Sequence, residues 1–179
     1  MLPSDERLMR RYAAGDDSAF RLLFSRYERK IYNFFMRRIG NVERAADLFQ
    51  ETFLRLHQNR HRFDSSRPFA PWLYTIANNL VRDELRMKRG IQFDVIEEES
   101  LPPSMLATLE ESMAATEIVE KVELALKILP ESQREVLLLS KSKGLTHRQI
   151  AEITSRSEAA VKQLLYRGLQ NLKRHLAEA

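Results

Sequence analysis

The sequence lacks cysteine altogether and is poor in glycine and proline. With no cysteine among 179 residues, disulfides and thiolate metal sites are excluded, and a reducing compartment fits best. Five glycines and six prolines leave few breaks in the chain, and apolar residues recur at helical spacing, so we expect an all-α protein. Neither an apolar leader nor a run of about 18 apolar residues is present. We therefore expect a cytoplasmic protein that does not enter a membrane.

Basic side chains are missing from one segment, residues 93–118, which carries seven carboxylates. Residues 1–92 hold 18 basic and 11 acidic side chains, and residues 119–179 hold 11 and 7. This distribution predicts two small basic helical domains, 1–92 and 119–179, joined by a flexible acidic linker, with a helical stretch after Ser104 as an alternative for part of it. Two basic modules favour a polyanionic partner such as nucleic acid.

Apolar periodicity, capping residues and breakers predict the helices. The expected ranges are 7–14, 18–40, 42–60, 71–89, 118–129, 131–141, a short helix after Thr146 and a last helix after Ser157. His57 and His61 lie four residues apart, a spacing that metal sites also use. Since no cysteine and no further histidine lies nearby, we interpret them as helix-end residues and expect no metal and no cofactor.

One face of the helix predicted at 42–60 combines acids, amides and a single leucine. Asp47, Gln50, Glu51 and Leu54 recur at helical spacing. They lie away from the predicted core stripe, which consists of Val42, Ala45, Ala46, Phe49, Phe53 and Leu56. An apolar centre within a polar rim suits the docking of a basic partner helix. An ordinary solvated face would show the same pattern, so both interpretations stay open.

The stretch from Phe63 to Arg89 joins a proline-bounded loop to a helix with a polar strip free of carboxylates. The strip consists of Thr75, Asn78, Asn79, Arg82, Arg86 and Arg89. We expect the strip to be exposed and most of the helix to be buried, with Leu73, Ile76, Ala77, Leu80 and Met87 at the centre of the buried face. Guanidinium, amide and hydroxyl groups suit a polyanion with hydrogen-bonding edges. The alternative is a solvated helix surface that is basic by chance.

Residues 146–173 show a helix-turn-helix pattern. Thr146 and Gln149 have the spacing of a capping box, and Ser155 and Arg156 form the turn. The final helix is expected to bury Val161, Leu165, Gly168, Leu169 and Leu172 and to expose Glu158, Ala159, Lys162, Gln163, Tyr166, Arg167, Gln170 and Lys173. Long polar side chains at the start of such a helix reach base edges in the major groove, and basic ones reach phosphates. A helical hairpin without a ligand is the alternative.

Three segments resemble motifs of one family. Residues 45–54, AADLFQETFL, are similar to the family's AEDLVQETFL segment, and residues 71–79, PWLYTIANN, are similar to its WLYxIARN segment. Leu129-Pro130 followed by REVL at 134–137 and the helix-turn-helix is similar to its C-terminal part. In this order the motifs resemble the sigma-70 family, most closely its extracytoplasmic-function (ECF) branch, which keeps only the second and fourth sigma domains. The resemblance covers nearly the whole chain.

The resemblance implies a promoter-specificity subunit that is not an enzyme, and it implies a role for each surface. Core RNA polymerase would dock on Asp47, Gln50, Glu51 and Leu54. Single-stranded minus-ten DNA, with a base turned out into the loop, would meet Phe63, Phe69, Trp72, Asn78, Asn79, Arg82 and Arg86. Trp72 fits equally well as a core residue. Duplex minus-thirty-five DNA would meet Thr146, Arg156, Glu158, Ala159, Lys162, Gln163, Tyr166 and Arg167. The acidic linker would thread toward the RNA exit path or fold back on the basic modules, and an anti-sigma factor would mask these surfaces.

The turn and the last helix depart from the family pattern. Ser155 stands where glycine is common, so it would adopt a positive φ at a cost of roughly 1 kcal/mol. Arg156 replaces an apolar residue and is expected to point outward toward phosphate. Leu164 and Leu169 stand where arginines are frequent, and Gln149 where glutamate is. We therefore expect duplex reading to be tuned differently from that of close relatives.

Two rival functions remain to be distinguished. A helix-turn-helix regulator with a ligand-sensing or dimerising N-terminal half would bind duplex DNA specifically without polymerase. A sigma factor would bind DNA weakly alone and direct transcription once core polymerase is added. An enzyme is disfavoured, since the sequence has no glycine-rich phosphate loop and no histidine paired with a nucleophile.

Overall fold

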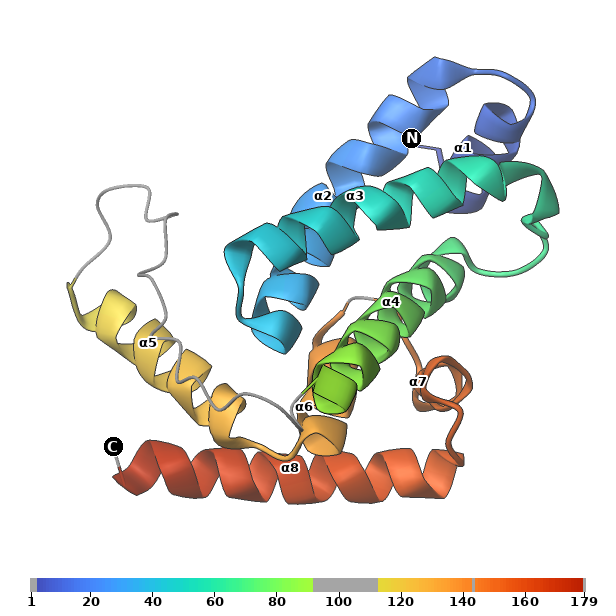
Figure 1. Ribbon diagram of the computed structural model, residues 1–179. Helices are drawn as coiled ribbons and strands as arrows, with labels where there is room; N and C mark the ends of the chain where they lie inside the picture. The colour runs from blue at the N-terminus through green and yellow to red at the C-terminus, as the bar shows by residue number, and fades with distance from the viewer. Residues whose placement is uncertain (1–2, 92–112, 143, 179) are drawn as a thin grey trace.

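The computed structural model describes residues 3–91, 113–142 and 144–178 (Figure 1), without the side chains of 89–91, 113–118 and 178. All regular elements in these ranges are helical, which confirms the all-α prediction. They are α1 (Asp5–Ala13), α2 (Asp17–Ile39), α3 (Val42–Gln58), the 3-10 helix η1 (Arg60–Arg62), α4 (Phe69–Ile91), α5 (Met113–Ile128), α6 (Glu131–Lys141), α7 (His147–Thr154) and α8 (Glu158–Glu178). No helix within these ranges is long and apolar enough to span a bilayer. Most of the predicted acidic linker lies outside them, and α5 begins within its last third.

The first module comprises α1 to α4. Asp16 caps α2 by accepting from the backbone N–H groups of Ser18 and Ala19, and α2 ends at Gly40 in the left-handed region, φ 72°. A chain of aromatic contacts joins α2 to α3, with Phe24 and Phe53 ring centroids 4.8 Å apart. Figure 1 shows α2 and α3 side by side with α4 crossing beside them. The capping residues and helix order therefore follow the local sequence signals.

The second module comprises α5 to α8, with α8 running along its base (Figure 1). The helices α6 and α8 approach closely at Gly168, where an added Cβ would lie 2.8 Å from Leu137 Cδ1. Gly168 is buried, but Leu169, predicted to be core, is 50% exposed. One residue advances a helix by about 100°, so the side that faces α6 at Gly168 leaves Leu169 turned toward solvent.

Two further core predictions are wrong, because each residue lies in a terminal part of its helix. Val42, the first residue of α3, is 47% exposed, and Met87, near the end of α4, is 55% exposed. By contrast Leu73, Ala77 and Leu80 of α4 are buried as expected.

The two modules pack against each other through α4 and α7 and through α2 with α5 and α6. Their buried hydrophobic side chains form one contiguous cluster. Helix α4 therefore lies between its own module and the helix-turn-helix, and this position decides which part of its polar strip is exposed.

Candidate nucleic-acid interface

The loop that precedes α4 is organised by a turn around Asp64. The Asp64 carboxylate accepts hydrogen bonds from the Ser66 backbone N–H at 2.9 Å and from the Ser66 hydroxyl at 2.7 Å. These bonds hold the pKa of Asp64 below its usual value. The Asp64 backbone carbonyl accepts from Arg67 N–H at 3.0 Å. Residues 64–68 are exposed, so the loop presents a preformed turn to solvent.

Aromatic rings close the base of this loop. Phe63 lies 5.1 Å from Trp72 and 5.8 Å from Phe69, centroid to centroid. Phe69 is fully buried, so its ring supports the loop from the core and offers no free stacking face. Phe63 and Trp72 are half-buried and pack against the core, so Trp72 is part of the core as well as part of the loop's floor.

A residue that the sequence analysis missed caps α4. The backbone N–H of Phe69 donates to Glu6 Oε1 at 3.0 Å, and Glu6 belongs to α1. Helix α1 is fixed on α2 by Asp5, which accepts from the Tyr27 hydroxyl at 2.6 Å and pairs with Arg26. A carboxylate at a helix N-terminus satisfies an unpaired N–H and interacts favourably with the helix dipole. In the sequence, Glu6 shows only as an acid in the first turn of a short helix.

The polar strip of α4 is exposed only in part. Asn79 and Arg86 are exposed, Thr75 and Arg82 are half-buried, and Asn78 is fully buried. The expectation of a fully exposed strip is therefore wrong at Asn78. The reason is the second module, which covers this side of the helix.

The cover is the C-terminal end of α7. Asn78 Nδ2 donates to the Ile153 carbonyl at 3.3 Å, and Arg82 Nη2 donates to the Thr154 carbonyl at 3.0 Å. The preceding carbonyls of α7, those of Ala151 and Glu152, already accept from the capping Ser155 N–H. The last carbonyls of a helix have no partner within it and carry partial negative charge. Helix α4 therefore supplies the two hydrogen bonds that complete this helix end.

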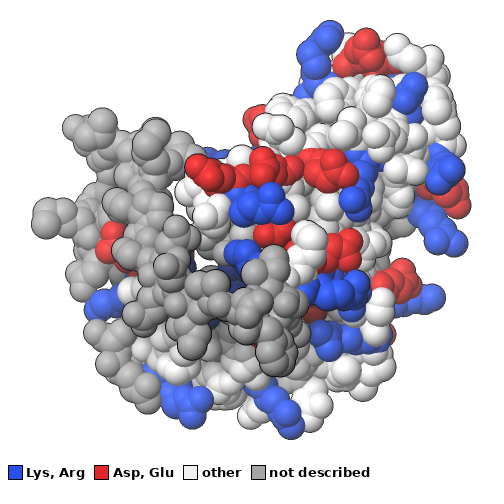
Figure 2. Space-filling model, viewed as in Figure 1, with Lys and Arg blue, Asp and Glu red and all other residues white. Residues whose placement is uncertain are grey.

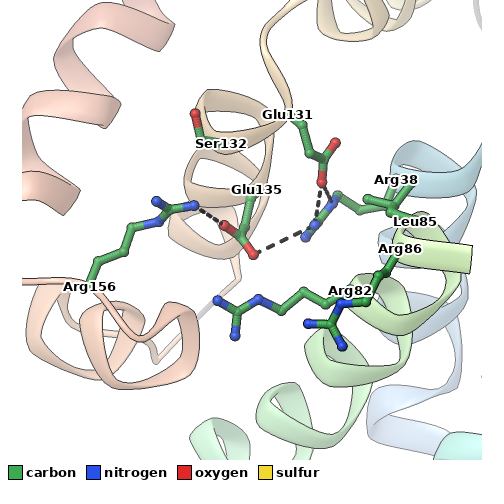
Figure 3. A pocket seen from close by; sticks show the side chains of 8 residues that line it. All are labelled: Arg38, Arg82, Leu85, Arg86, Glu131, Ser132, Glu135 and Arg156. Carbon is green, nitrogen blue, oxygen red and sulfur yellow. Dashed lines mark hydrogen bonds and ion pairs between the residues drawn. The ribbon is translucent and has the colours of Figure 1, made fainter. Parts of the chain in front are cut away.

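Beside these bonds lies an ion-pair cluster formed by Arg38 of α2, Glu131 and Glu135 of α6 and Arg156 of the turn (Figure 3). The Arg38 side chain is 1% exposed. It donates from Nε to Glu131 at 2.8 Å and from Nη1 to Asn78 Oδ1 at 3.0 Å, and Nη2 lies 3.6 Å from Glu135. Burial lowers the pKa of Arg38, while the carboxylates oppose this shift. Removing one partner of such a buried pair costs roughly 3–5 kcal/mol.

Arg156 does not point outward as expected. It pairs with Glu135 at 3.0 Å, while its Nε is buried with no partner among the described residues. Glu135 is buried, and burying a carboxylate without a positive partner costs free energy, so the ion pair with Arg156 is favourable. The residues of this ion-pair cluster line a cavity of about 450 Å3, and Arg82 and Arg86 of α4 line it as well (Figure 3).

The sequence analysis missed Arg38, Glu131 and Glu135. The burial of Arg38 could have been predicted from its spacing. Arg38 follows the core residues Ile31 and Phe34 at i+7 and i+4, so it falls on the buried side of α2.

The second candidate surface, at the start of α8, is open. Thr146 and Gln149 form the expected capping box, and Ser155 adopts φ 54°, as its position in the turn predicted. All predicted contact residues of the last helix are exposed: Glu158, Ala159, Lys162, Gln163, Tyr166 and Arg167. Gln170 and Lys173, further along the helix and outside this set, are exposed too. Lys162 and Glu158 pair with each other at 3.0 Å. Exposed pairs of this kind contribute less than about 1 kcal/mol and break readily.

The third candidate surface lies on α3. Asp47 and Gln50 are exposed, Leu54 is 49% exposed and Glu51 is half-buried. Figure 2 shows a row of carboxylates along this helix. Asp47 and Glu51 pair with Arg44 and Arg55 of the same helix, at 3.1 and 2.7 Å. The leucine therefore sits within a polar, accessible rim.

Of the two histidines in α3 and η1, His57 has a partner in α1. His57 Nδ1 lies 2.5 Å from the Tyr12 hydroxyl, which ties the end of α3 to α1. Within the described ranges no group of three potential metal ligands exists.

Comparisons with known proteins agree with this architecture. Residues 23–91 match the family model described as Sigma-70 region 2, and residues 120–172 match the one described as Sigma-70, region 4. The ECF RNA polymerase sigma factor SigW of Bacillus subtilis is 31% identical over 174 residues, which cover 92% of each chain. The RNA polymerase sigma factor CarQ of Myxococcus xanthus is 31% identical over 170 residues, 95% of this chain and 96% of CarQ.

A likeness to solved structures extends over the whole fold. CnrH, in complex with the cytosolic domain of CnrY, matches with a TM-score of 0.72 at 24% identity, covering 98% of this chain and 99% of CnrH. RpoE of Bartonella quintana, in complex with the anti-sigma factor NepR, matches with a TM-score of 0.72 at 21% identity, covering 88% and 96%. At these identities the likeness concerns the fold. Given the sequence relatives, the chain belongs to the ECF sigma factors of the sigma-70 family, which act in promoter-specific transcription initiation.

Proposed function

We propose that this sigma factor uses its three polar surfaces for three separate contacts: core RNA polymerase, the minus-ten element and the minus-thirty-five element. The observation that carries the proposal is the preformed loop at 64–68 beside the carboxylate-free strip of α4. The protein works in the cytoplasm without a catalytic site of its own, and the chemistry of RNA synthesis belongs to polymerase.

The surface on α3 docks on polymerase. Asp47, Gln50 and Glu51 surround the exposed Leu54, an arrangement suited to a basic partner helix. The apolar centre supplies affinity, and the rim of acids and amides fixes the register.

The loop and α4 bind the single-stranded minus-ten element. A base turned out of the stack needs a pocket with aromatic and hydrogen-bonding groups. Phe63 and Trp72 form the floor of the loop, with Phe69 supporting them from below. The donors on α4 then hold the strand; they are Asn78, Asn79, Arg82 and Arg86.

The helix-turn-helix binds the minus-thirty-five element as duplex. Glu158, Ala159, Lys162 and Gln163 lie in the first turns of α8, where side chains reach base edges. Thr146, Tyr166 and Arg167 flank them and meet the phosphate backbone, whereas Arg156 is engaged with Glu135.

An anti-sigma factor is the further partner that we propose. RpoE of Bartonella quintana was solved with an anti-sigma factor, and it shares the fold of this chain. The domain division at 1–92, 93–118 and 119–179 follows the charge pattern and the two matched regions. A role of the acidic linker in the RNA path or in self-inhibition remains a prediction for residues outside the described ranges.

Run-off transcription tests this function. Purified core polymerase and this protein are incubated with a library of genomic fragments, and new start sites are mapped. We expect start sites that need both proteins. Specific duplex binding without any polymerase-dependent start site, under conditions where a control sigma factor works, would favour the helix-turn-helix regulator instead.

A further inference from the structure

We infer that the packed arrangement of the two modules is a self-inhibited state that masks Asn78 and Arg82 of the minus-ten surface and leaves the other two surfaces open. This inference rests on the proposed function of α4. It concerns regulation by the chain itself, without a second protein.

The masking works because the carbonyl end of α7 takes the place of a nucleic-acid acceptor. Asn78 and Arg82 donate to the carbonyls of Ile153 and Thr154. Amide and guanidinium groups are the donors that contact base edges and phosphate oxygens in nucleic-acid complexes. The Nδ2 group of Asn78 and the Nη2 group of Arg82 are therefore already engaged, so α7 and the minus-ten strand compete for the same side chains.

The Arg38 cluster holds this arrangement in place. Arg38 bonds to Asn78 within its own module and to Glu131 across the boundary, and Glu135 lies 3.6 Å away (Figure 3). Arg156, in the turn that follows α7, pairs with Glu135. The two ion pairs meet at one buried glutamate, so they fix α6 and the end of α7 against α2 and α4 together.

The exposure of the three surfaces is unequal. Asn78 is buried and Arg82 is half-buried, whereas Lys162, Gln163 and Leu54 are exposed. A general closure of the molecule would hide both DNA surfaces. This one covers Asn78 and part of Arg82, while the loop at 64–68, Asn79 and Arg86 stay exposed. The free protein is therefore expected to bind duplex DNA normally and single-stranded DNA weakly.

Opening does not require either module to unfold. Besides the apolar contacts of the shared cluster, the boundary includes ion pairs and side chain to carbonyl bonds, groups that water or DNA can satisfy after separation. Interfaces between the domains of one chain resemble transient interfaces, for which relative domain motion is the ordinary expectation. A ligand that binds only the open state has an apparent affinity reduced by the fraction of open molecules.

The test measures module separation and DNA binding in the full chain. Since the sequence has no cysteine, fluorophores are placed by Glu28→Cys on α2 and Ala177→Cys on α8, both exposed positions. Energy transfer reports the separation. Anisotropy reports binding to a random-sequence single-stranded DNA pool and to a random-sequence duplex pool.

The opening variant is Arg38→Met, which removes the charge and retains much of the bulk. Glu131→Arg serves as a second opening variant, because it places two guanidinium groups against each other. Arg29→Met, at an exposed position of the same helix, is the control. Thermal unfolding verifies that every variant is folded.

Both opening variants should lower energy transfer and raise the affinity for single-stranded DNA on the order of tenfold. Duplex affinity should stay within about twofold, and Arg29→Met should behave as the parent protein. An equal gain for duplex DNA would overturn the selective masking.

Two further outcomes separate the inference from the proposed function. Unchanged energy transfer and unchanged single-strand binding, with Asn79→Ala still impairing promoter opening in holoenzyme, would overturn the self-inhibited state alone. Separated modules with no gain in single-strand binding, and no effect of Asn79→Ala, would overturn the minus-ten role of α4 itself.

Discussion

The two regions that we propose to bind DNA differ in whether another part of the chain contacts them. The start of α8 is open to solvent, with Lys162, Gln163 and Tyr166 exposed. The strip of α4 is partly engaged, with Asn78 and Arg82 bound to the end of α7. Both are basic helix surfaces, so charge does not separate them. The two surfaces differ in position. Helix α4 lies at the boundary between the modules, whereas the contact residues of α8 are exposed to solvent.

Under the self-inhibition that we propose, a donor surface is regulated without a new partner. The last carbonyl groups of any helix have no hydrogen-bond donor within the helix and are satisfied by donors from outside it. In this chain the donors come from the surface proposed to bind single-stranded DNA. The variants below break or sharpen the contrast between the two regions, starting with the largest expected effect.

Removing the exposed donors of the α4 strip should have the strongest consequence. The double substitution Asn79→Ala with Arg86→Ala removes contacts worth about 1–3 kcal/mol each. We expect promoter opening, measured by permanganate reactivity of the minus-ten region, to fall on the order of 100-fold. Affinity for core polymerase should be unchanged. Loss of polymerase binding would instead show that α4 is the docking face.

On the open surface, Gln163→Ala should weaken duplex binding about tenfold, the loss expected for one base contact. The effect should be the same in free protein and in holoenzyme, because this surface is exposed in both. Gel-shift titration with a selected promoter duplex measures it. Gln170→Ala, two turns further along α8, is the matched control. A loss seen only in holoenzyme would mean that the packed state covers this surface too.

The cap on α4 tests how the loop is held. Glu6→Ala leaves the Phe69 N–H without its acceptor, a cost of about 1 kcal/mol. We expect promoter opening to fall about fivefold, while duplex affinity stays the same. Glu6→Gln retains an acceptor oxygen and should restore most of the activity. An equal loss in both variants, or the same loss in the exposed Glu28→Ala, would argue against a cap.

The turn at Asp64 should give the smallest effect. Bonds from Ser66 lower the pKa of Asp64 in the folded protein, so their stabilisation of the loop is present above the unfolded pKa and is lost as pH falls through the folded one. Because Asp64 is exposed, Asp64→Ala should reduce single-strand binding by an opening variant roughly twofold. An NMR titration of the Asp64 carboxyl group measures the shift. A pKa at or above the usual value would remove the basis for this turn.

Local signals account for most of the helix ends. Asp16, Asn41 and Thr146 cap the helices that follow them, as their residue types predicted. Helix α4 is an exception, because it begins at Phe69, two residues before the proline that was expected to start it. Its cap comes from Glu6, 63 positions away in the chain, and no local pattern contains that information.

The sequence by itself determined the helices, most of their caps, the helix-turn-helix and the family, because each depends on residues within a few turns of one another. The tertiary structure alone decided which donors are free. Asn78 and Asn79 are neighbours on one strip, yet Asn79 is exposed and Asn78 is buried against Ile153, 75 positions later. Periodicity places a side chain on a face of its helix. Only the packing of a distant helix against that face determines whether the side chain meets solvent, DNA or another part of the same protein.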